Sequence, residues 1–144
     1  IDNASEKYEI IIFIGKSERK IDEINFNDNK VFYAEKSIVL KELKNKKILA
    51  FSGLGNNHNF LNLLKEQKFD IVKFLQFPDH YNYSSKEIRN ILKIASKDKL
   101  SVVTTEKDYL KIPPSLQTKI NVAKLSIKIK NEKKFLKLLL GSLF

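Results

Sequence analysis

The sequence contains no cysteine, methionine or tryptophan, and only four glycines and three prolines among its 144 residues. Without cysteine the chain has no disulfide framework, no thiolate zinc site and no cysteine nucleophile. Few glycines and prolines, together with 42% hydrophobic residues, exclude a collagen-like, low-complexity or disordered chain. No apolar run reaches the roughly 18 residues that a membrane-spanning helix needs. A chain of this length is expected to form one domain with a real hydrophobic core.

Charge is the other imbalance, because 27 lysines and arginines stand against 17 acidic residues, a net charge of +10. Such an excess attracts anionic partners, namely nucleic acid, acidic lipid headgroups or a phosphorylated substrate. Only Arg19 and Arg89 are arginines, although arginine is the residue that forks onto phosphates and base edges. The lysines are scattered along the chain, which favours a solvated basic surface.

A non-enzymatic basic α/β module that binds nucleic acid is the alternative to an enzyme, and it rests on charge alone. The sequence contains no aromatic RNA-binding motif, no arginine-rich face and no recognition helix. A free-standing dinucleotide-binding domain is weaker still, because the position where its fingerprint needs a third glycine holds His58.

Apolar runs of strand length alternate with segments of helical periodicity, which predicts an α/β fold. Strands joined by helices pair in parallel through right-handed crossovers, so we expect three layers, with a mostly parallel sheet and flanking helices. Ser84 and Glu87 form a capping box that marks the start of one helix. The expected strands are residues 8–14, 48–51, 69–77, 100–103 and 120–129, with a short extended piece at 31–34; further helices are expected from the glycine turn to about residue 67 and over 132–140.

Three turns follow three of these strands, and the chemistry of parallel sheets gathers at the carboxyl ends of strands. The first turn, residues 52–57, contains Gly53, Gly55 and Asn56 and opens a helix. Its glycines let the backbone approach a ligand, and the helix N-terminus offers free N–H groups to an anion. A plain tight turn between strand and helix explains the same residues.

The second turn, residues 77–83, places Asp79 beside His80. A neighbouring carboxylate can orient an imidazole and raise its basicity, and such a histidine can act as a general base toward a hydroxyl group. Pro78 fixes the entry to the turn, and Tyr81 and Tyr83 are expected to form walls of the site. The alternative is an exposed loop histidine whose neighbouring aspartate caps a turn.

The third turn, residues 104–108, offers hydroxyls, a cation and carboxylates from Thr104, Thr105, Glu106, Lys107 and Asp108. These side chains are expected to contact a nucleotide or its substrate. Alternatively, Thr105 and Asp108 form an N-cap pair for a short helix. No metal site is predicted, because carboxylates and histidines are not clustered at ligand spacing, and His58 is expected to be solvated.

Taken together, the three turns resemble the C-terminal part of the tetraacyldisaccharide 4'-kinase family of lipid A synthesis. The matching stretches, in chain order, are ILAFSGLGN at 48–56, FPDH at 77–80 and VVTTEKD at 102–108. The ordered set is more specific than any single motif. The resemblance is firm from Lys46 to Pro113 and looser over the rest of the chain.

The resemblance implies a fold similar to the C-terminal lobe of a P-loop kinase and transfer of the ATP γ-phosphate to the 4'-hydroxyl of a tetraacyldisaccharide 1-phosphate. It implies a need for Mg²⁺ and a peripheral position at the cytoplasmic face of the inner membrane. The implied partners are the lipid A disaccharide precursor and the anionic membrane surface, with no nucleic acid. His80 matches the histidine of the family's Asp-His motif, which would activate the sugar hydroxyl with an acidic residue of the N-terminal half; Gly53, Gly55, Asn56 and residues 104–108 would bind nucleotide or substrate.

Two positions depart from the family pattern, because Asn57 stands where proline is common and Tyr81 where a second histidine usually follows the first. The family's phosphate-binding loop and Mg²⁺ ligands precede the matching region, and no GxxxxGK[ST] motif occurs in this sequence. Together with the missing methionine, this predicts that residues 1–144 form a single α/β domain from the C-terminal part of a longer kinase. The isolated chain is expected to be soluble and folded but inactive.

Overall fold

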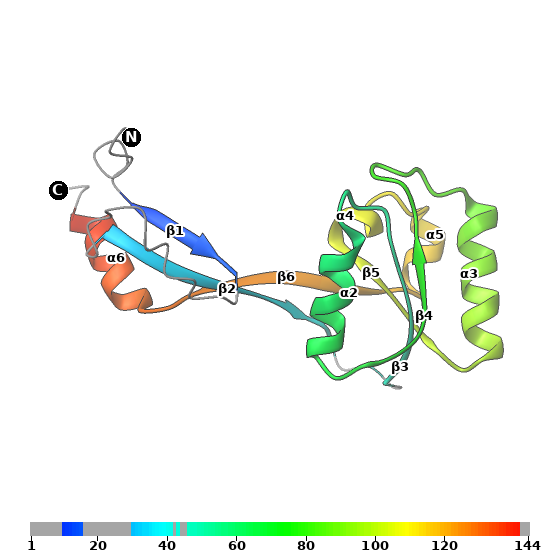
Figure 1. The fold of residues 1–144 in the computed structure, drawn as a ribbon. Coiled ribbons are helices and arrows are strands. Elements are labelled where there is room, and N and C mark those ends of the chain that lie inside the picture. Colours follow the sequence, from blue (N-terminus) through cyan, green and yellow to red (C-terminus); the bar gives the residue numbers. More distant parts are fainter. Residues whose placement is uncertain (1–9, 16–29, 42, 44–45, 142–144) are drawn as a thin grey trace. The chain divides into compact units, whose positions relative to one another are not determined.

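The computed structural model describes residues 10–15, 30–41, 43 and 46–141 (Figure 1). Contacts divide the chain into two compact units. Unit 1 comprises Ile1–Ser37 and Ser126–Phe144, and unit 2 comprises Ile38–Leu125. None of the described helices is long and apolar enough to cross a membrane.

Unit 2 is built on a parallel sheet. Strand β3 (Lys47–Ser52) lies between β4 (Asp70–Gln76) and β5 (Ser101–Thr105), and β5 pairs with the start of β6 (Asn121–Ile129). Helix α2 (Asn57–Glu66) connects β3 to β4, and α3 (Ser85–Lys97) connects β4 to β5. The short helices α4 (Glu106–Tyr109) and α5 (Pro114–Gln117) precede β6. The predicted α/β fold with parallel strands is confirmed, and the carboxyl ends of β3, β4 and β5 share one edge.

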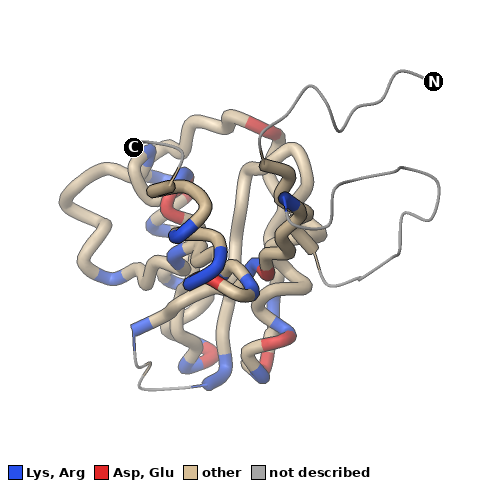
Figure 2. The backbone as a smooth tube through the Cα atoms, turned by 90° about the vertical axis from the view of Figure 1, so that its left-hand side faces the viewer, with Lys and Arg blue, Asp and Glu red and all other residues tan. Residues whose placement is uncertain are grey.

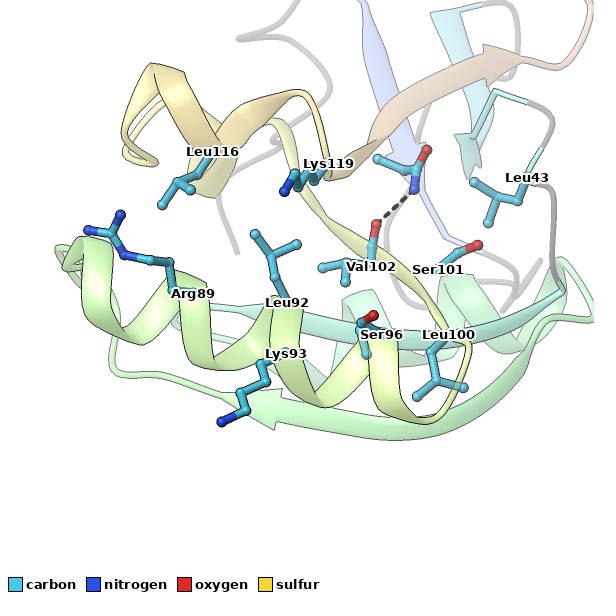
Figure 3. A pocket seen from close by; sticks show the side chains of 12 residues that line it. Leu43, Arg89, Leu92, Lys93, Ser96, Leu100, Ser101, Val102, Leu116 and Lys119 are labelled. Atoms are coloured by element: carbon cyan, nitrogen blue, oxygen red, sulfur yellow. Dashed lines mark hydrogen bonds between the residues drawn. The ribbon is translucent and has the colours of Figure 1, made fainter.

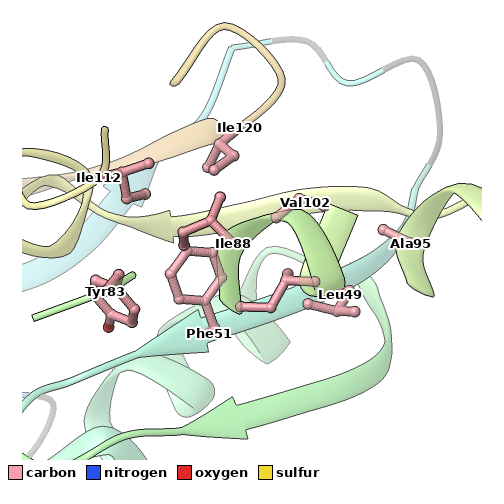
Figure 4. Packing of buried hydrophobic residues seen from close by; sticks show 9 residues of the cluster. Leu49, Phe51, Tyr83, Ile88, Ala95, Val102, Ile112 and Ile120 are labelled. Carbon is pink, nitrogen blue, oxygen red and sulfur yellow. The ribbon is translucent and has the colours of Figure 1, made fainter. Parts of the chain in front are cut away.

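Helices cover both faces of this sheet, as the expected three layers require. Successive side chains of β3 point to opposite faces, so Leu49 and Phe51 pack with α3 whereas Ile48 and Ala50 pack with α2. All four side chains are completely buried, which explains why the strand is apolar at every one of these positions. Figure 4 shows the α3 side of the core, where Phe51 lies among residues of α3 and Tyr83.

Helix α3 begins where the capping box predicts. The Ser84 hydroxyl accepts a hydrogen bond from the Glu87 N–H (3.2 Å), and the Glu87 carboxylate accepts one from the Ser84 N–H (2.9 Å). Two free donors of the first turn are therefore satisfied. Ile88, Ile91 and Ala95 then form the buried stripe that holds the helix on the sheet.

Replacing Ser84 by alanine removes the acceptor for the Glu87 N–H. We expect the free energy of unfolding to fall by about 1 kcal/mol, the usual effect of losing an N-cap side chain. Urea denaturation of the chain measures this loss. The matched control is Ser96→Ala in the last turn of α3, where serine is exposed and the change should stay within about 0.5 kcal/mol; equal losses in both variants would contradict the role of the cap.

Unit 1 contains β1 (Ile11–Ile14), part of β2 (Val31–Val39), the end of β6 and α6 (Glu132–Gly141). Strand β1 pairs in parallel with β2, and Phe135 of α6 packs edge-on against Phe32 with ring centroids 5.2 Å apart. The short piece expected at 31–34 is wrong in length, because β2 has nine residues. Of the strand expected at 8–14, residues 8 and 9 lie outside the described residues.

Candidate functional site

The three turns meet at the carboxyl edge of the sheet in unit 2, and direct contacts join each pair. The Gly53 N–H donates to Asp108 Oδ2 (3.0 Å), which joins the first turn to the third. The Phe77 N–H donates to the Ser52 carbonyl (2.9 Å), which joins the second turn to the first. Lys107 Nζ lies 3.5 Å from Asp79 Oδ1, which joins the third turn to the second. Residues more than 50 positions apart, such as Gly53 and Asp108 (55 residues), thus form one cluster.

Three backbone donors in the first turn and at the start of the helix that follows it are occupied by side chains. Asp108 accepts from the Gly53 N–H, the Asn57 side-chain oxygen accepts from the Leu54 N–H (3.0 Å), and the Asn56 side-chain oxygen accepts from the Asn59 N–H (3.2 Å). Of these three, the Asn59 N–H belongs to the first turn of α2, where free N–H groups could otherwise bind an anion. A plain strand-to-helix turn accounts for these three hydrogen bonds. Gly55 and Asn56 are exposed, and their contact with a ligand stays a prediction.

Gly53 is required by its surroundings. A Cβ atom at this position would lie 2.9 Å from the Pro78 carbonyl oxygen, 3.1 Å from the Tyr83 hydroxyl and 3.3 Å from Asp108 Oδ1. The first of these distances is shorter than side chains tolerate, and the obstacle is backbone that cannot swing away. The second turn therefore packs directly against the first at Gly53.

The third turn, expected at residues 104–108, is the end of β5 followed directly by α4, and it has a buried and an exposed part. Thr104 and Asp108 are fully buried and Thr105 is 9% exposed. The Thr104 hydroxyl donates to the Phe51 carbonyl (2.8 Å), and the Thr105 hydroxyl donates to Asp108 Oδ2 (2.7 Å) while accepting from the Asp108 N–H (3.1 Å). The N-cap pair is confirmed as the start of α4. Glu106 and Lys107 are exposed and are the members of this turn that face solvent.

The second turn is the most exposed of the three, with 44% of the Asp79 side chain and 75% of the His80 side chain accessible. His80 has a φ of 58°, a left-handed conformation that is uncommon outside glycine. Asp79 Oδ1 accepts from the His80 N–H (2.9 Å), whereas Asp79 Oδ2 lies 3.7 Å from His80 Nε2. That separation is too long for the expected orienting hydrogen bond, so Asp79 holds the backbone of the turn and acts on the imidazole through its charge.

Lys107 contributes to the electrostatics of this edge. Desolvation raises the pKa of Asp79, but the hydrogen bond from the His80 N–H and the charges of His80 and Lys107 outweigh it and hold that pKa below its ordinary value. Asp79 is therefore a carboxylate at neutral pH. Lysine and arginine recur on elements throughout the described chain (Figure 2), in line with the scattered basic residues of the sequence.

Tyr83 is not a wall of the site, contrary to expectation. It is 6% exposed, and its ring packs edge-on against Phe51 (5.3 Å) and Phe77 (5.1 Å). Burial, and then the nearby Asp108 carboxylate, raise the pKa of Tyr83 far above its ordinary value, so the hydroxyl stays neutral. Tyr81 is half-buried and donates a hydrogen bond to Glu87, the capping residue of α3.

Asn57 is a site residue that the sequence analysis missed. Its side-chain oxygen accepts from the Ser52 hydroxyl (2.6 Å) and the Leu54 N–H, and its side-chain nitrogen donates to the Phe77 carbonyl (3.1 Å). One amide thus fixes the first turn and ties it to the second. The only signal in the sequence is that this residue stands at the first position of α2 in place of a common proline.

Outside the three turns, the described residues form no other site of comparable chemistry. Within the described ranges no three histidine, cysteine or acidic side chains are placed to hold a metal ion. His58 is exposed, as expected. A groove of about 870 Å³ runs along α3, lined among others by Leu92, Val102 and Leu116, but its lining includes none of the three turns (Figure 3).

Comparison with known proteins places this cluster in a family context. The family model described as tetraacyldisaccharide-1-P 4'-kinase matches residues 5–143. Tetraacyldisaccharide 4'-kinase of Pelagibacter ubique is 41% identical over 90 residues, 62% of this chain and 29% of that protein. The enzyme of the same name from Rickettsia bellii is 43% identical over 72 residues, 50% of this chain and 22% of that protein. These matches span less than a third of the length of the curated relatives.

A solved structure shares the fold. The crystal structure of LpxK from Aquifex aeolicus in complex with ATP superposes with a TM-score of 0.62 and 22% sequence identity, covering 96% of this chain and 44% of that one. The α/β arrangement is therefore one that a solved member of this group also adopts.

Proposed function

The chain belongs to the tetraacyldisaccharide-1-P 4'-kinase family, and we propose that it forms part of an enzyme that transfers the γ-phosphate of ATP to the 4'-hydroxyl of a tetraacyldisaccharide 1-phosphate. The observation that carries this proposal is the family match over residues 5–143, which contains all three converging turns. The ATP named with the solved relative supports ATP as the phosphate donor.

His80 is proposed as the general base. Its imidazole is exposed at the carboxyl edge of the sheet, where a sugar hydroxyl can reach it, and a base must lie within hydrogen-bond distance of the proton that it removes. The ring accepts the proton of the 4'-hydroxyl as the oxygen bonds to the γ-phosphorus and ADP leaves. Asp79, 3.7 Å from Nε2, stabilises the imidazolium that forms, because an opposite charge at this range favours the charged ring.

The remaining candidate residues divide by exposure. Gly55, Asn56, Glu106 and Lys107 are exposed, and we propose that they contact the nucleotide or the sugar phosphate. Gly53, Thr104, Thr105 and Asp108 are buried with internal hydrogen bonds. Their proposed contribution is to support the exposed residues.

Mg²⁺ does not fit the residues in hand. In the part of the chain that the structure describes, no cluster of acidic or histidine side chains could hold it. We propose that the Mg²⁺ ligands and the phosphate-binding loop lie in a part of the family fold outside the 44% of the solved relative that this chain matches.

We also propose a peripheral position on an anionic membrane surface at the cytoplasmic side of the inner membrane. The net charge of +10 supports it, since each lysine near such a surface adds about 1 kcal/mol of attraction.

The direct test is phosphate transfer from radiolabelled ATP to tetraacyldisaccharide 1-phosphate by the whole protein that carries these residues, with the isolated 144-residue chain in parallel. We expect transfer by the whole protein and none by the chain alone. The matched control substrate is the same lipid already phosphorylated at the 4'-position, which offers no acceptor hydroxyl. An inactive whole protein contradicts the proposed function, and an active isolated chain contradicts the placement of the phosphate-binding loop elsewhere.

A further inference from the structure

We propose that Asp108 is a positioning residue: its buried carboxylate fixes the Gly53 backbone and, through the packing around Gly53, the turn that carries His80. It does so without touching substrate. The effect on catalysis rests on the proposed function, whereas the effect on the structure of the turn does not.

One carboxylate oxygen of Asp108 organises two elements. Asp108 is fully buried, and its Oδ2 accepts hydrogen bonds from the Gly53 N–H (3.0 Å) and the Thr105 hydroxyl (2.7 Å). Its own N–H donates to the same Thr105 hydroxyl (3.1 Å), which locks the carboxylate onto the start of α4. Because hydrogen bonds to a charged acceptor are strong, the Gly53 backbone is held in place against the start of α4.

The second oxygen faces the junction with the second turn. Asp108 Oδ1 lies 3.6 Å from Lys111 Nζ, whose positive charge offsets the cost of burying the carboxylate. The Tyr83 hydroxyl faces the same carboxylate, which adds to the effect of burial in raising the pKa of that hydroxyl. Oδ1 and the Tyr83 hydroxyl border the Cα of Gly53, at 3.3 and 3.1 Å from the position that a Cβ would take, and the Pro78 carbonyl oxygen is nearer still at 2.9 Å.

This junction controls the turn at His80. The Pro78 carbonyl beside Gly53 also accepts a hydrogen bond from the Tyr81 N–H (3.2 Å), and this hydrogen bond closes the turn around Asp79 and His80. If the Gly53 backbone moved, the Pro78 carbonyl beside it could move as well. The hydrogen bond that closes the turn would then weaken, and His80 could leave its left-handed conformation. Full burial and two internal donors leave the carboxylate no path to a ligand, so its influence on the reaction passes through Gly53 and Pro78.

Asp108→Ala and Asp108→Asn separate positioning from simple support of the fold. Asparagine can place its side-chain oxygen where Oδ2 lies and keep both hydrogen bonds, whereas alanine keeps neither. The asparagine NH₂ group takes the place of Oδ1 and loses the ion pair with Lys111, so this variant is expected to be less stable while the Gly53 backbone stays held. The matched control is Asn121→Ala, which removes another side-chain hydrogen bond to backbone, from Asn121 to the Val102 carbonyl (3.0 Å), at the far end of β5.

NMR of the two histidine rings reads the result directly, because His80 and His58 are the only histidines. In Asp108→Ala we expect the ring resonances of His80 to shift, those of His58 to stay, and amide exchange at Gly53 to accelerate by about tenfold or more, the factor that corresponds to losing a hydrogen bond to a charged acceptor. In Asp108→Asn and Asn121→Ala both readouts should match the unchanged chain. If Asp108→Ala does not fold, Thr105→Val should give the same pattern with smaller shifts, because it removes one donor to Oδ2 and the acceptor for the Asp108 N–H but keeps the hydrogen bond from Gly53.

Kinetics of the whole protein supply the second readout. Asp108→Ala should lower kcat by about ten- to a hundredfold, as expected for a small misplacement of a catalytic group, with KM little changed, and Asp108→Asn should restore it. An unmoved His80 ring in folded Asp108→Ala or Thr105→Val, or equal defects in the alanine and asparagine variants, overturns the positioning role. If the whole protein does not phosphorylate the lipid but Asp108→Ala still shifts the His80 resonances, the positioning role is supported and only the proposed function is rejected.

Discussion

His80→Asn in the whole protein should lower kcat by about a hundred- to ten-thousand-fold, the usual contribution of a general base. Asparagine suits this position because it tolerates the left-handed backbone that His80 adopts at a φ of 58°. It keeps a polar side chain, shorter than that of histidine, but accepts no proton at neutral pH. The loss therefore reports the missing base and not a strained turn.

Steady-state kinetics with saturating ATP and lipid measure this effect. His58→Asn is the matched control, because His58 is exposed at the start of α2 and outside the three turns' contacts, and its kcat should stay unchanged. A kcat for His80→Asn within about threefold of the unchanged enzyme would remove His80 from the mechanism, since general bases contribute far more.

Phe51→Ala should lower the free energy of unfolding by about 3–5 kcal/mol, the cost of deleting a buried phenylalanine ring. Phe51 is completely buried and its ring packs against Phe77 (6.2 Å) and Tyr83 (5.3 Å). The cavity opens under the first and second turns together, so few neighbours can close it without moving the edge of the sheet.

Denaturant unfolding of the chain measures the loss. Leu110→Ala is the control, because Leu110 is 79% exposed and surface truncations stay within about 0.5 kcal/mol. If Phe51→Ala fails to fold, Phe51→Leu provides a smaller, measurable loss at the same site. A Phe51 variant as stable as Leu110→Ala would contradict the packing of this core.

The elements that the sequence predicted well are those whose signal is local. The capping box of Ser84 and Glu87 lies within four residues and marks α3 correctly. The apolar run at 48–51 predicts a short buried strand, and the structure confirms this at Ile48 and Leu49. The apolar run at 8–14 has the pattern of a strand buried on both faces, and this is wrong, because Ile12 and Ile14 are exposed. The length of β2 escaped prediction because Glu35 and Lys36 interrupt its apolar pattern. In unit 1 Glu35 forms an ion pair with Lys130 (3.2 Å), which lies far away in the sequence.

The same distinction holds at the candidate site. The sequence alone determined that three turns follow three parallel strands and that Asp79, His80 and Lys107 stand in them, because strand periodicity and turn residues are written in neighbouring positions. Only the tertiary structure decided that Asp108 binds the backbone of Gly53, 55 residues away, and that Tyr83 belongs to the core. Whether a carboxylate faces a ligand or the protein's own amide depends on which backbone lies opposite it, and that neighbour is set by packing of the whole sheet.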